Sequence, residues 1–211
     1  TYCNQVTSYI RSLIRKGTLE IGAPVKEAVL SEQLGISRAP IREALQVLVQ
    51  EGLITSEPQK GKHVRQMTGK EIYDSYVVAG ILEGAGVAES LPLWTEANME
   101  TFRSVVRQME GKISYATKLD ELAEIDELFH ATLFMACDNT RLVEMARTSC
   151  ATISKYLYYQ HWITMFTPRE YADRHHAVAE AVYSRDVKHV ETALRDHYKE
   201  TGLRMAQFGK E

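Results

Sequence analysis

Cysteine is scarce in this 211-residue chain, and its three cysteines (Cys3, Cys137 and Cys150) are widely separated. They form neither a CxxC pair nor a disulfide framework, which indicates a reducing compartment. The chain also lacks an apolar run near the ~20 residues that span a bilayer. Residues 1–16 lack the charged-then-apolar layout of an export signal. These absences predict a cytoplasmic protein with no membrane partner.

The net charge of −3 is unevenly distributed along the chain. Residues 1–66 hold 9 Lys/Arg and 6 Asp/Glu, a balance of +3, which leaves 16 Lys/Arg and 22 Asp/Glu, a balance of −6, for residues 67–211. The 45% hydrophobic and 25% charged content is that of a globular protein. A small basic domain joined to a larger acidic one suits nucleic-acid binding, because only the first domain approaches phosphates.

Apolar spacing in the first part of the chain predicts three helices followed by a β-hairpin. The first helix ends at Gly17, the second covers about 27–34, and the third runs from an N-cap at Ser37 to Gly52. Residues 53–55, 58–61 and 63–65 have the pattern of strand, turn and strand. We therefore predict a winged helix-turn-helix domain over residues 1–67.

From Thr68 the pattern becomes almost wholly helical. Helices are expected at about 69–91, 96–112, 119–136, 140–164, 168–184 and 187–206. Thr95, Thr167 and Asp186 suit N-caps, and Pro168 suits a first helical position. The predicted fold class is mainly α, with an all-α helical bundle over residues 68–211.

The predicted third helix carries the residue types that read DNA. Such a recognition helix lies in the major groove and presents its N-terminal residues to base edges. Here these residues include Ser37, Arg38 and Arg42, and the two arginines share one face because they are four positions apart. An Arg fork can bridge guanine O6 and N7. The hairpin tip, Lys60-Gly61-Lys62, adds two positive charges suited to the DNA backbone or minor groove.

Taken alone, Arg38 and Arg42 could equally form a solvated helix face. The stretch LSEQLGISRAPIREALQVLVQEGLI, followed by a glycine-containing hairpin and Val64, resembles the N-terminal winged helix of GntR-type bacterial transcription regulators. The resemblance implies that both arginines contact bases or phosphates and that Gly61 lets the wing approach DNA closely. Some relatives carry a further Arg where this chain has Ala28, which indicates a different operator.

Four residues that commonly bind metals lie on or beside the apolar stripes of three predicted helices. Asp126 falls within the stripe of helix 119–136, with His130 at its edge; His175 and His197 fall within those of helices 168–184 and 187–206. His176 points away from its helix's stripe. One carboxylate and three imidazoles match the ligand chemistry of Zn²⁺, Ni²⁺ or Co²⁺, with Mn²⁺ also possible.

Each of these residues also has a purely structural interpretation. A single histidine on an apolar stripe is usually a hydrogen-bonded core residue, and Asp126 with His130 can form an ion pair. A buried carboxylate still needs a partner. The convergence of four such residues on three stripes favours a metal site.

The pattern Asp126-x-x-Phe129-His130, Asn139-x-x-Leu142, His175, Asp186 and His197 resembles the FCD domain, the helical effector domain of FadR-like GntR regulators. The resemblance implies a divalent metal, most often zinc, on Asp126, His130, His175 and His197, and a small carboxylate effector. Many FCD domains carry an Arg four residues before the position of Glu83, where this chain has Ala79. Tyr76 is a candidate for the wall of the effector pocket.

The sequence thus predicts a non-enzymatic transcription regulator, a repressor that binds a palindromic operator as a homodimer. An effector bound in the helical domain would shift its conformational populations. Three alternatives stay open: a metal-free regulator that senses an apolar or acyl ligand, a sensor of the metal itself, and a metal-dependent hydrolase.

Overall fold

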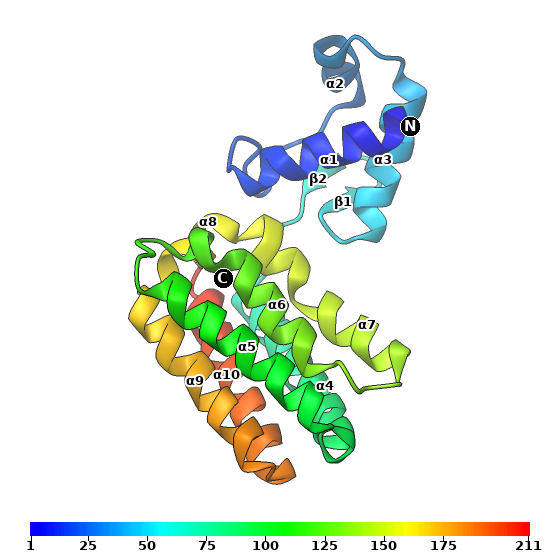
Figure 1. Cartoon of the computed structure of the whole chain (residues 1–211). Coiled ribbons are helices and arrows are strands. Elements are labelled where there is room, and N and C mark those ends of the chain that lie inside the picture. The colour runs from blue at the N-terminus through cyan, green and yellow to red at the C-terminus, as the bar shows by residue number, and fades with distance from the viewer. The chain divides into compact units, whose positions relative to one another are not determined.

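The computed structural model describes residues 1–211 and divides them into two compact units. Unit 1 consists of residues 1–68, 151–160 and 209–211, and unit 2 consists of residues 69–150 and 161–208. Helices dominate both units, and the single sheet has two strands, so the predicted mainly-α fold class is confirmed (Figure 1).

Unit 1 contains a three-helix winged fold. Helix α1 covers Tyr2–Arg15, α2 covers Glu27–Leu34 and α3 covers Arg38–Gln50. Its core forms where the apolar faces of these helices meet the hairpin, and consists chiefly of Val6, Ile10, Ile14, Leu30, Ile41, Leu45, Leu48, Leu53, Ile54 and Val64. Gly35 connects α2 to α3 in the left-handed conformation (φ 65°), which glycine adopts without steric cost.

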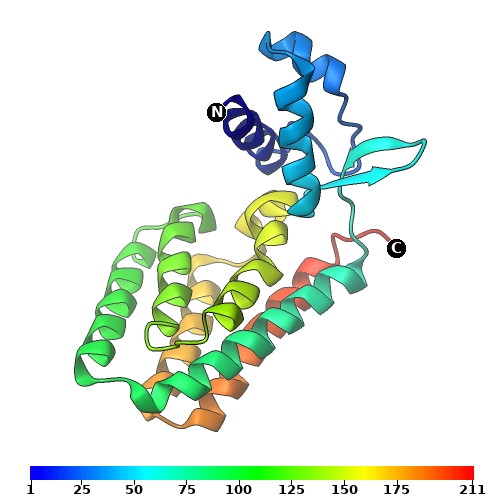
Figure 2. The same cartoon turned by 90° about the vertical axis from the view of Figure 1, so that its right-hand side faces the viewer.

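The hairpin consists of β1 (Ile54–Glu57) and β2 (Gly61–Val64), which pair antiparallel with Glu57 opposite Gly61 (Figure 2). The strands extend closer to the turn than predicted, so Gly61 lies in β2 rather than in the turn. Ser37 occupies the N-cap position of α3, but its hydroxyl makes no capping hydrogen bond, which corrects the predicted role of that side chain. The extended backbone at Ser37 still begins the helix at Arg38.

A segment from the middle of the chain, residues 151–160, completes unit 1. It includes a π-helix, η3, over Ile153–Leu157. Within unit 1, Thr152 Oγ1 donates to the carbonyl of Glu51 (3.3 Å) and Gln160 Nε2 donates to the carbonyl of Arg15 (2.8 Å). These carbonyls lie at the C-terminal ends of α3 and α1, where no intrahelical donor is available.

Unit 2 is a helical bundle. Its helices are α4 (Gly69–Ser90), α5 (Glu96–Ile113), α6 (Ala123–Leu133), α7 (Thr140–Ser149), α9 (Pro168–Ser184) and α10 (Val187–Ala206), with α8 (Tyr159–Met165) leading into α9 and short 3₁₀ turns η1 (Leu91–Leu93) and η2 (Leu119–Leu122). Thr95 and Thr167 form capping boxes, and Asp186 caps α10 by accepting from two backbone N–H groups. Glycines at 80 and 202 let α4 and α10 approach closely, since an added Cβ would lie 2.8 Å from Tyr198 Cβ and Tyr76 Cβ, respectively.

Two predicted helices differ from those observed. The predicted single helix 140–164 is helical but not continuous: α7 ends at Ser149, a π-helix over Ile153–Leu157 belongs to unit 1, and α8 follows from Tyr159. An apolar stripe does not reveal which of two cores it packs against. The predicted helix 119–136 begins as a 3₁₀ turn and ends at Leu133.

The expectation that no apolar run approaches the length of a membrane span is contradicted for α4. By length and composition, residues Gly69–Leu93 would suffice to cross a membrane, with a mean hydropathy of 1.2 over an 18-residue window. Half of that window is buried inside the structure. A helix at the centre of a bundle meets the same criterion, so this is weak evidence for a membrane span.

Candidate metal centre and nucleic-acid interface

The recognition helix α3 presents its arginines to solvent. Arg38 is the first residue of the helix, is exposed, and makes no ion pair. The Arg42 side chain retains 69% of its accessible surface although it pairs with Glu27 at 3.2 Å. Both guanidinium groups are therefore available to a groove, as the major-groove interpretation requires.

The two lysines of the wing have different environments. Lys60 is 73% exposed at the tip, where it pairs with Glu57 at 2.7 Å. Lys62 is only 22% exposed, because its ammonium group is held 3.1 Å from Glu27. Gly61 has φ 83°, a conformation that other residues adopt only with strain, and an added Cβ would meet no atom within 4 Å. The tip is thus Lys60 and Gly61, with Lys62 set back against α2.

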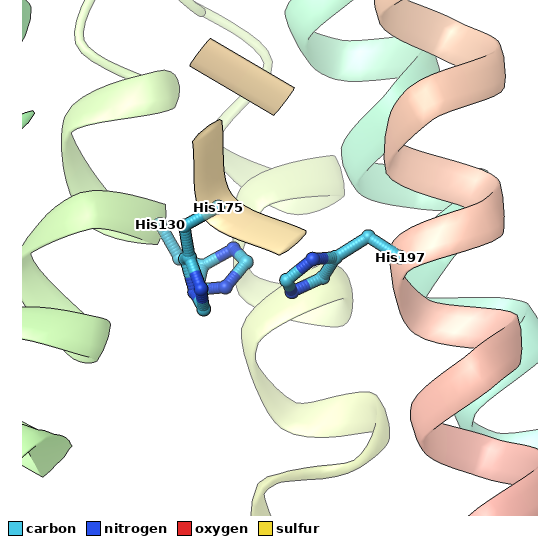
Figure 3. A group of neighbouring side chains, drawn as sticks. All are labelled: His130, His175 and His197. Atoms are coloured by element: carbon cyan, nitrogen blue, oxygen red, sulfur yellow. The ribbon is translucent and has the colours of Figure 1, made fainter. Parts of the chain in front are cut away.

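In unit 2, three histidines from three helices converge. His130 comes from α6, His175 from α9 and His197 from α10, and one ligand nitrogen of each lies within 4.8 Å of the others. Figure 3 shows their rings directed toward a common space. His176 instead points toward Glu110 (3.2 Å) outside this cluster.

His175 is the most buried member of the cluster, with 1% exposure. Its Nδ1 lies 2.7 Å from the Tyr171 carbonyl, and its Nε2 lies 3.1 Å from Asp126 Oδ1. Burial lowers the pKa of His175, so the ring is neutral near pH 7. A neutral imidazole has one proton for these two acceptors. In the metal-free chain Nε2–H can donate to Asp126. When the proton resides on Nδ1 instead and is donated to the Tyr171 carbonyl, the Nε2 lone pair is free to bind a cation beside Oδ1.

Asp126 supplies the anionic donor. Burial raises its pKa, but the hydrogen bond with His175 and the charge of His130 more than compensate, so the net pKa is lowered and the carboxylate is ionised. Its side chain keeps 27% of its accessible surface. Asp126 is not part of the group of histidine nitrogens that lie within 4.8 Å of one another; it contacts the cluster through His175, on a side that solvent reaches.

His130 is oriented by a buried glutamate that sequence reasoning did not place at the site. Its Nδ1 lies 2.6 Å from Oε1 of Glu83, a residue of α4 that is 3% exposed, and the Tyr198 hydroxyl donates to the other Glu83 oxygen at 2.8 Å. Burial opposes protonation of His130, but the charge and hydrogen bond of Glu83 outweigh it and raise the His130 pKa to about 9. Metal-binding histidines commonly donate their second N–H to such a carboxylate.

His197 provides a nitrogen without a partner. Its Nδ1 is buried and neither accepts nor donates a hydrogen bond. Burial, followed by the charge of Arg174, lowers its pKa well below the ordinary value, so the ring is neutral. Arg174 also donates to the backbone carbonyl of His197 and to Thr201 Oγ1 (2.6 Å), which fixes this turn of α10. The unpartnered nitrogen of His197, the neutral ring of His175, the His130 ring oriented by Glu83 and the Asp126 carboxylate are donor types that fit a divalent metal, which would displace the proton of His130 on binding.

Tyr76 lies on α4, seven residues before Glu83. It is 2% exposed and packs against Gly202 of α10. Its assignment to an effector pocket stays a prediction.

Comparison with known proteins identifies the two parts of the chain. Residues 3–64 match the family model for bacterial regulatory proteins of the gntR family, and residues 74–200 match the FCD domain. The HTH-type transcriptional repressor RspR of Escherichia coli is 26% identical over 193 residues, which cover 90% of this chain and 82% of RspR. The "Probable D-xylose utilization operon transcriptional repressor" of Paenarthrobacter nicotinovorans is 31% identical over 146 residues, covering 68% of this chain and 62% of that protein.

Solved structures show the same fold. E. coli McbR/YncC superimposes with a TM-score of 0.72 at 20% identity, covering 98% of each chain. GntR regulators are DNA-binding proteins without enzymatic activity, which sets the hydrolase alternative aside, and they respond to small-molecule effectors; some FCD domains bind metals. The chain therefore belongs to the GntR family of bacterial transcription regulators and carries an FCD domain after its winged helix.

Proposed function

We propose that this protein is a cytoplasmic repressor that binds a palindromic operator as a homodimer and is controlled by a small carboxylate at a divalent metal. Arg38 and Arg42 read base edges, while Lys60, Gly61 and Lys62 of the wing, with Ser37 at the helix start, follow the backbone. The repressor assignment is supported by the names of the relatives. A dimer follows from the need to place two recognition helices one DNA turn apart.

The observation that carries the metal assignment is the contact between His175 and Asp126. The Tyr171 carbonyl can hold the single proton of the neutral His175 ring on Nδ1, which leaves Nε2 free to bind a cation beside the Asp126 carboxylate. The buried Nδ1 of His197, another histidine of the cluster, has no hydrogen-bond partner. Asp126, His130, His175 and His197 would hold the ion. Zinc is the first candidate, and nickel, cobalt or manganese also accept these donors.

The carboxylate effector follows from the donor set. When bound, a metal would supply a Lewis-acidic centre for oxygen donors of a ligand. The protein's own residues prepare that position: Glu83 orients His130, Tyr171 orients His175, and Arg174 fixes the turn that carries His197. The partly exposed side of Asp126 gives a small molecule access.

The chain path provides a route from the effector unit to the DNA-binding unit. Helix α8 connects the metal-ligating α9 to residues 151–160, which bond to the ends of α1 and α3 within unit 1. A ligand that prefers one position of α9 thereby favours one arrangement of this segment. The operator-competent population then changes according to the ligand's differential affinity.

The test uses a labelled DNA fragment from upstream of the protein's own gene, with fluorescence anisotropy as the readout. We expect salt-dependent, sequence-selective binding that an Arg38→Ala/Arg42→Ala variant loses. Addition of zinc with a panel of small dicarboxylates should weaken the parent's binding. Absence of selective binding would contradict the regulator assignment at this DNA. Release by acyl-chain carboxylates in chelator would instead support the metal-free alternative, and release by zinc alone would support a metal sensor.

A further inference from the structure

Glu27, the first residue of α2, lies between the two cations proposed to face DNA from different elements. Its Oε2 is 3.2 Å from both Nε and one terminal nitrogen of Arg42 on the recognition helix. Its Oε1 is 3.1 Å from the ammonium group of Lys62 on the wing. One carboxylate thus connects α2, α3 and β2.

The backbone around Glu27 makes this arrangement rigid. The Val25 N–H donates to the Lys62 carbonyl at 2.8 Å, and the Val64 N–H donates to the Ala23 carbonyl at 2.9 Å. The chain that leads into α2 is therefore fixed along β2 before Glu27 is reached. The hydrogen bond from Lys62 lowers the pKa of Glu27, against the effect of burial, so the bridge is ionic at neutral pH.

The bridge leaves part of Arg42 free. Glu27 occupies the edge formed by Nε and one terminal nitrogen, and the Arg42 side chain remains 69% exposed. A guanidinium carries five N–H donors, so the end that bears both terminal nitrogens can still donate hydrogen bonds to a base. The Lys62 side chain, in contrast, is 22% exposed, so its ammonium group has little freedom to move away from Glu27 toward a phosphate.

We propose that Glu27 is a positioning residue for operator recognition: it sets the direction of Arg42 relative to the wing and offsets two positive charges that would otherwise strengthen binding to any DNA. A side chain held in place before binding loses less entropy on contact. A negative charge near phosphates weakens sequence-independent binding, which is electrostatic. Both effects increase the ratio of specific to non-specific affinity. This inference rests on the proposed DNA contacts of Arg42 and Lys62.

The experiment first selects duplexes from a random-sequence pool with the parent protein. Dissociation constants for a selected duplex and a scrambled duplex are then measured over a range of KCl concentrations. The variants are Glu27→Gln, which keeps the shape but removes the charge, Glu27→Asp, which keeps the charge on a shorter side chain, and Glu32→Gln. Glu32 is an exposed residue of the same helix with no cation partner, so its variant removes the same net charge without the bridge.

We expect Glu27→Gln to bind the scrambled duplex more tightly and to lose about tenfold in the specific-to-non-specific ratio, as for one misplaced Arg–guanine pair. The salt dependence on scrambled DNA should steepen by about one phosphate contact. Glu32→Gln should leave the ratio unchanged, and Glu27→Asp should recover part of it. Circular dichroism confirms folding of each variant.

The outcomes separate this inference from the proposed function. If the parent binds selectively and Glu27→Gln behaves like Glu32→Gln, the positioning role is wrong and the regulator assignment stands. If the selection yields no preferred sequence for the parent, both fail. A Glu27→Gln variant that weakens both duplexes equally would show a structural role only and would also overturn the inference.

Discussion

The Nδ1 atom of His130 lies 2.6 Å from Oε1 of Glu83, and this contact connects the candidate metal site to helix α4. Glu83 is almost fully buried, and its second oxygen accepts a hydrogen bond from Tyr198 at 2.8 Å. The carboxylate therefore fixes the orientation of the His130 ring and directs Nε2 away from α4. Its position depends on the close approach of α4 and α10 at Gly80.

Replacement of Glu83 by Gln should weaken metal binding. The amide keeps the shape of the carboxylate, but it lowers the basicity of His130 and holds its ring less firmly in one orientation. Loss of such a partner of a metal ligand typically costs 10–100-fold in metal affinity. Competition of the protein with a fluorescent zinc chelator measures this effect. Glu89→Gln, at an exposed position of the same helix, is the matched control. Equal zinc affinities for the two variants would contradict the role of Glu83.

The stability of the metal-free protein should fall between pH 6.5 and about 9. The His130 pKa is raised to about 9 in the folded state, chiefly by Glu83 against the effect of burial, so the folded chain holds a proton that the unfolded chain releases above pH 6.5. This stabilisation is fully present below pH 6.5 and is lost as the pH rises through about 9. The expected slope is about 1.4 kcal/mol per pH unit within that window.

Urea denaturation in the presence of chelator gives this pH profile. Glu83→Gln serves as the comparison, because it removes the charge that raises the His130 pKa. A parent and variant with the same slope between pH 6.5 and 9 would show that His130 does not titrate as described.

Loss of the Tyr158 hydroxyl should destabilise the DNA-binding unit. This hydroxyl accepts from the Met67 N–H at 3.2 Å and donates to the Met67 carbonyl at 3.3 Å, and Tyr158 is 1% exposed. Tyr158→Phe leaves a buried N–H without that acceptor, which costs about 1–3 kcal/mol. Urea denaturation is again the measurement, with the half-buried Tyr156→Phe as control. Equal stabilities of the two variants would indicate that residues 151–160 do not brace unit 1.

Arg38 and Lys60 should affect DNA binding in different ways. Arg38→Ala should relax discrimination at one base pair and cost about 1–3 kcal/mol on the operator. Lys60→Ala should weaken binding to all sequences and reduce the salt slope by about 0.9. Anisotropy titrations with matched and mismatched duplexes distinguish the two, and Lys199→Ala, at an exposed position of α10, controls for net charge. A uniform loss for Arg38→Ala would assign that residue to phosphate contacts.

Much of the fold was predictable because local signals and tertiary packing agree. The N-caps at Thr95, Thr167 and Asp186 match those observed, and helices 168–184 and 187–206 have the predicted bounds. The breaks within the predicted helix 140–164 were missed because its residues are divided between two units, and no local pattern identifies which unit a residue joins. Its π-helical segment packs on unit 1, a long-range relationship that periodicity does not encode.

The candidate site was predictable in part for a similar reason. A polar residue on an apolar stripe reveals that it faces inward, and this sufficed to select His175 rather than His176. Glu83 and Glu27 were missed, since their partners come from other elements and are set by packing. Glu83 lies on a helix that is apolar on most of its surface. The sequence therefore does not indicate which way its side chain points; the close packing of α4 against α10 sets that direction.

Metal content of the untagged protein tests the central claim most directly, measured by inductively coupled plasma mass spectrometry beside a His175→Ala/His197→Ala variant. We predict about one divalent ion per parent chain, as expected for a single four-ligand site. The variant should lose the ion while its winged helix still binds DNA. A parent that holds no metal after reconstitution with zinc, nickel, cobalt or manganese and dialysis would contradict the metal centre and leave Asp126 and the histidines as a buried polar network.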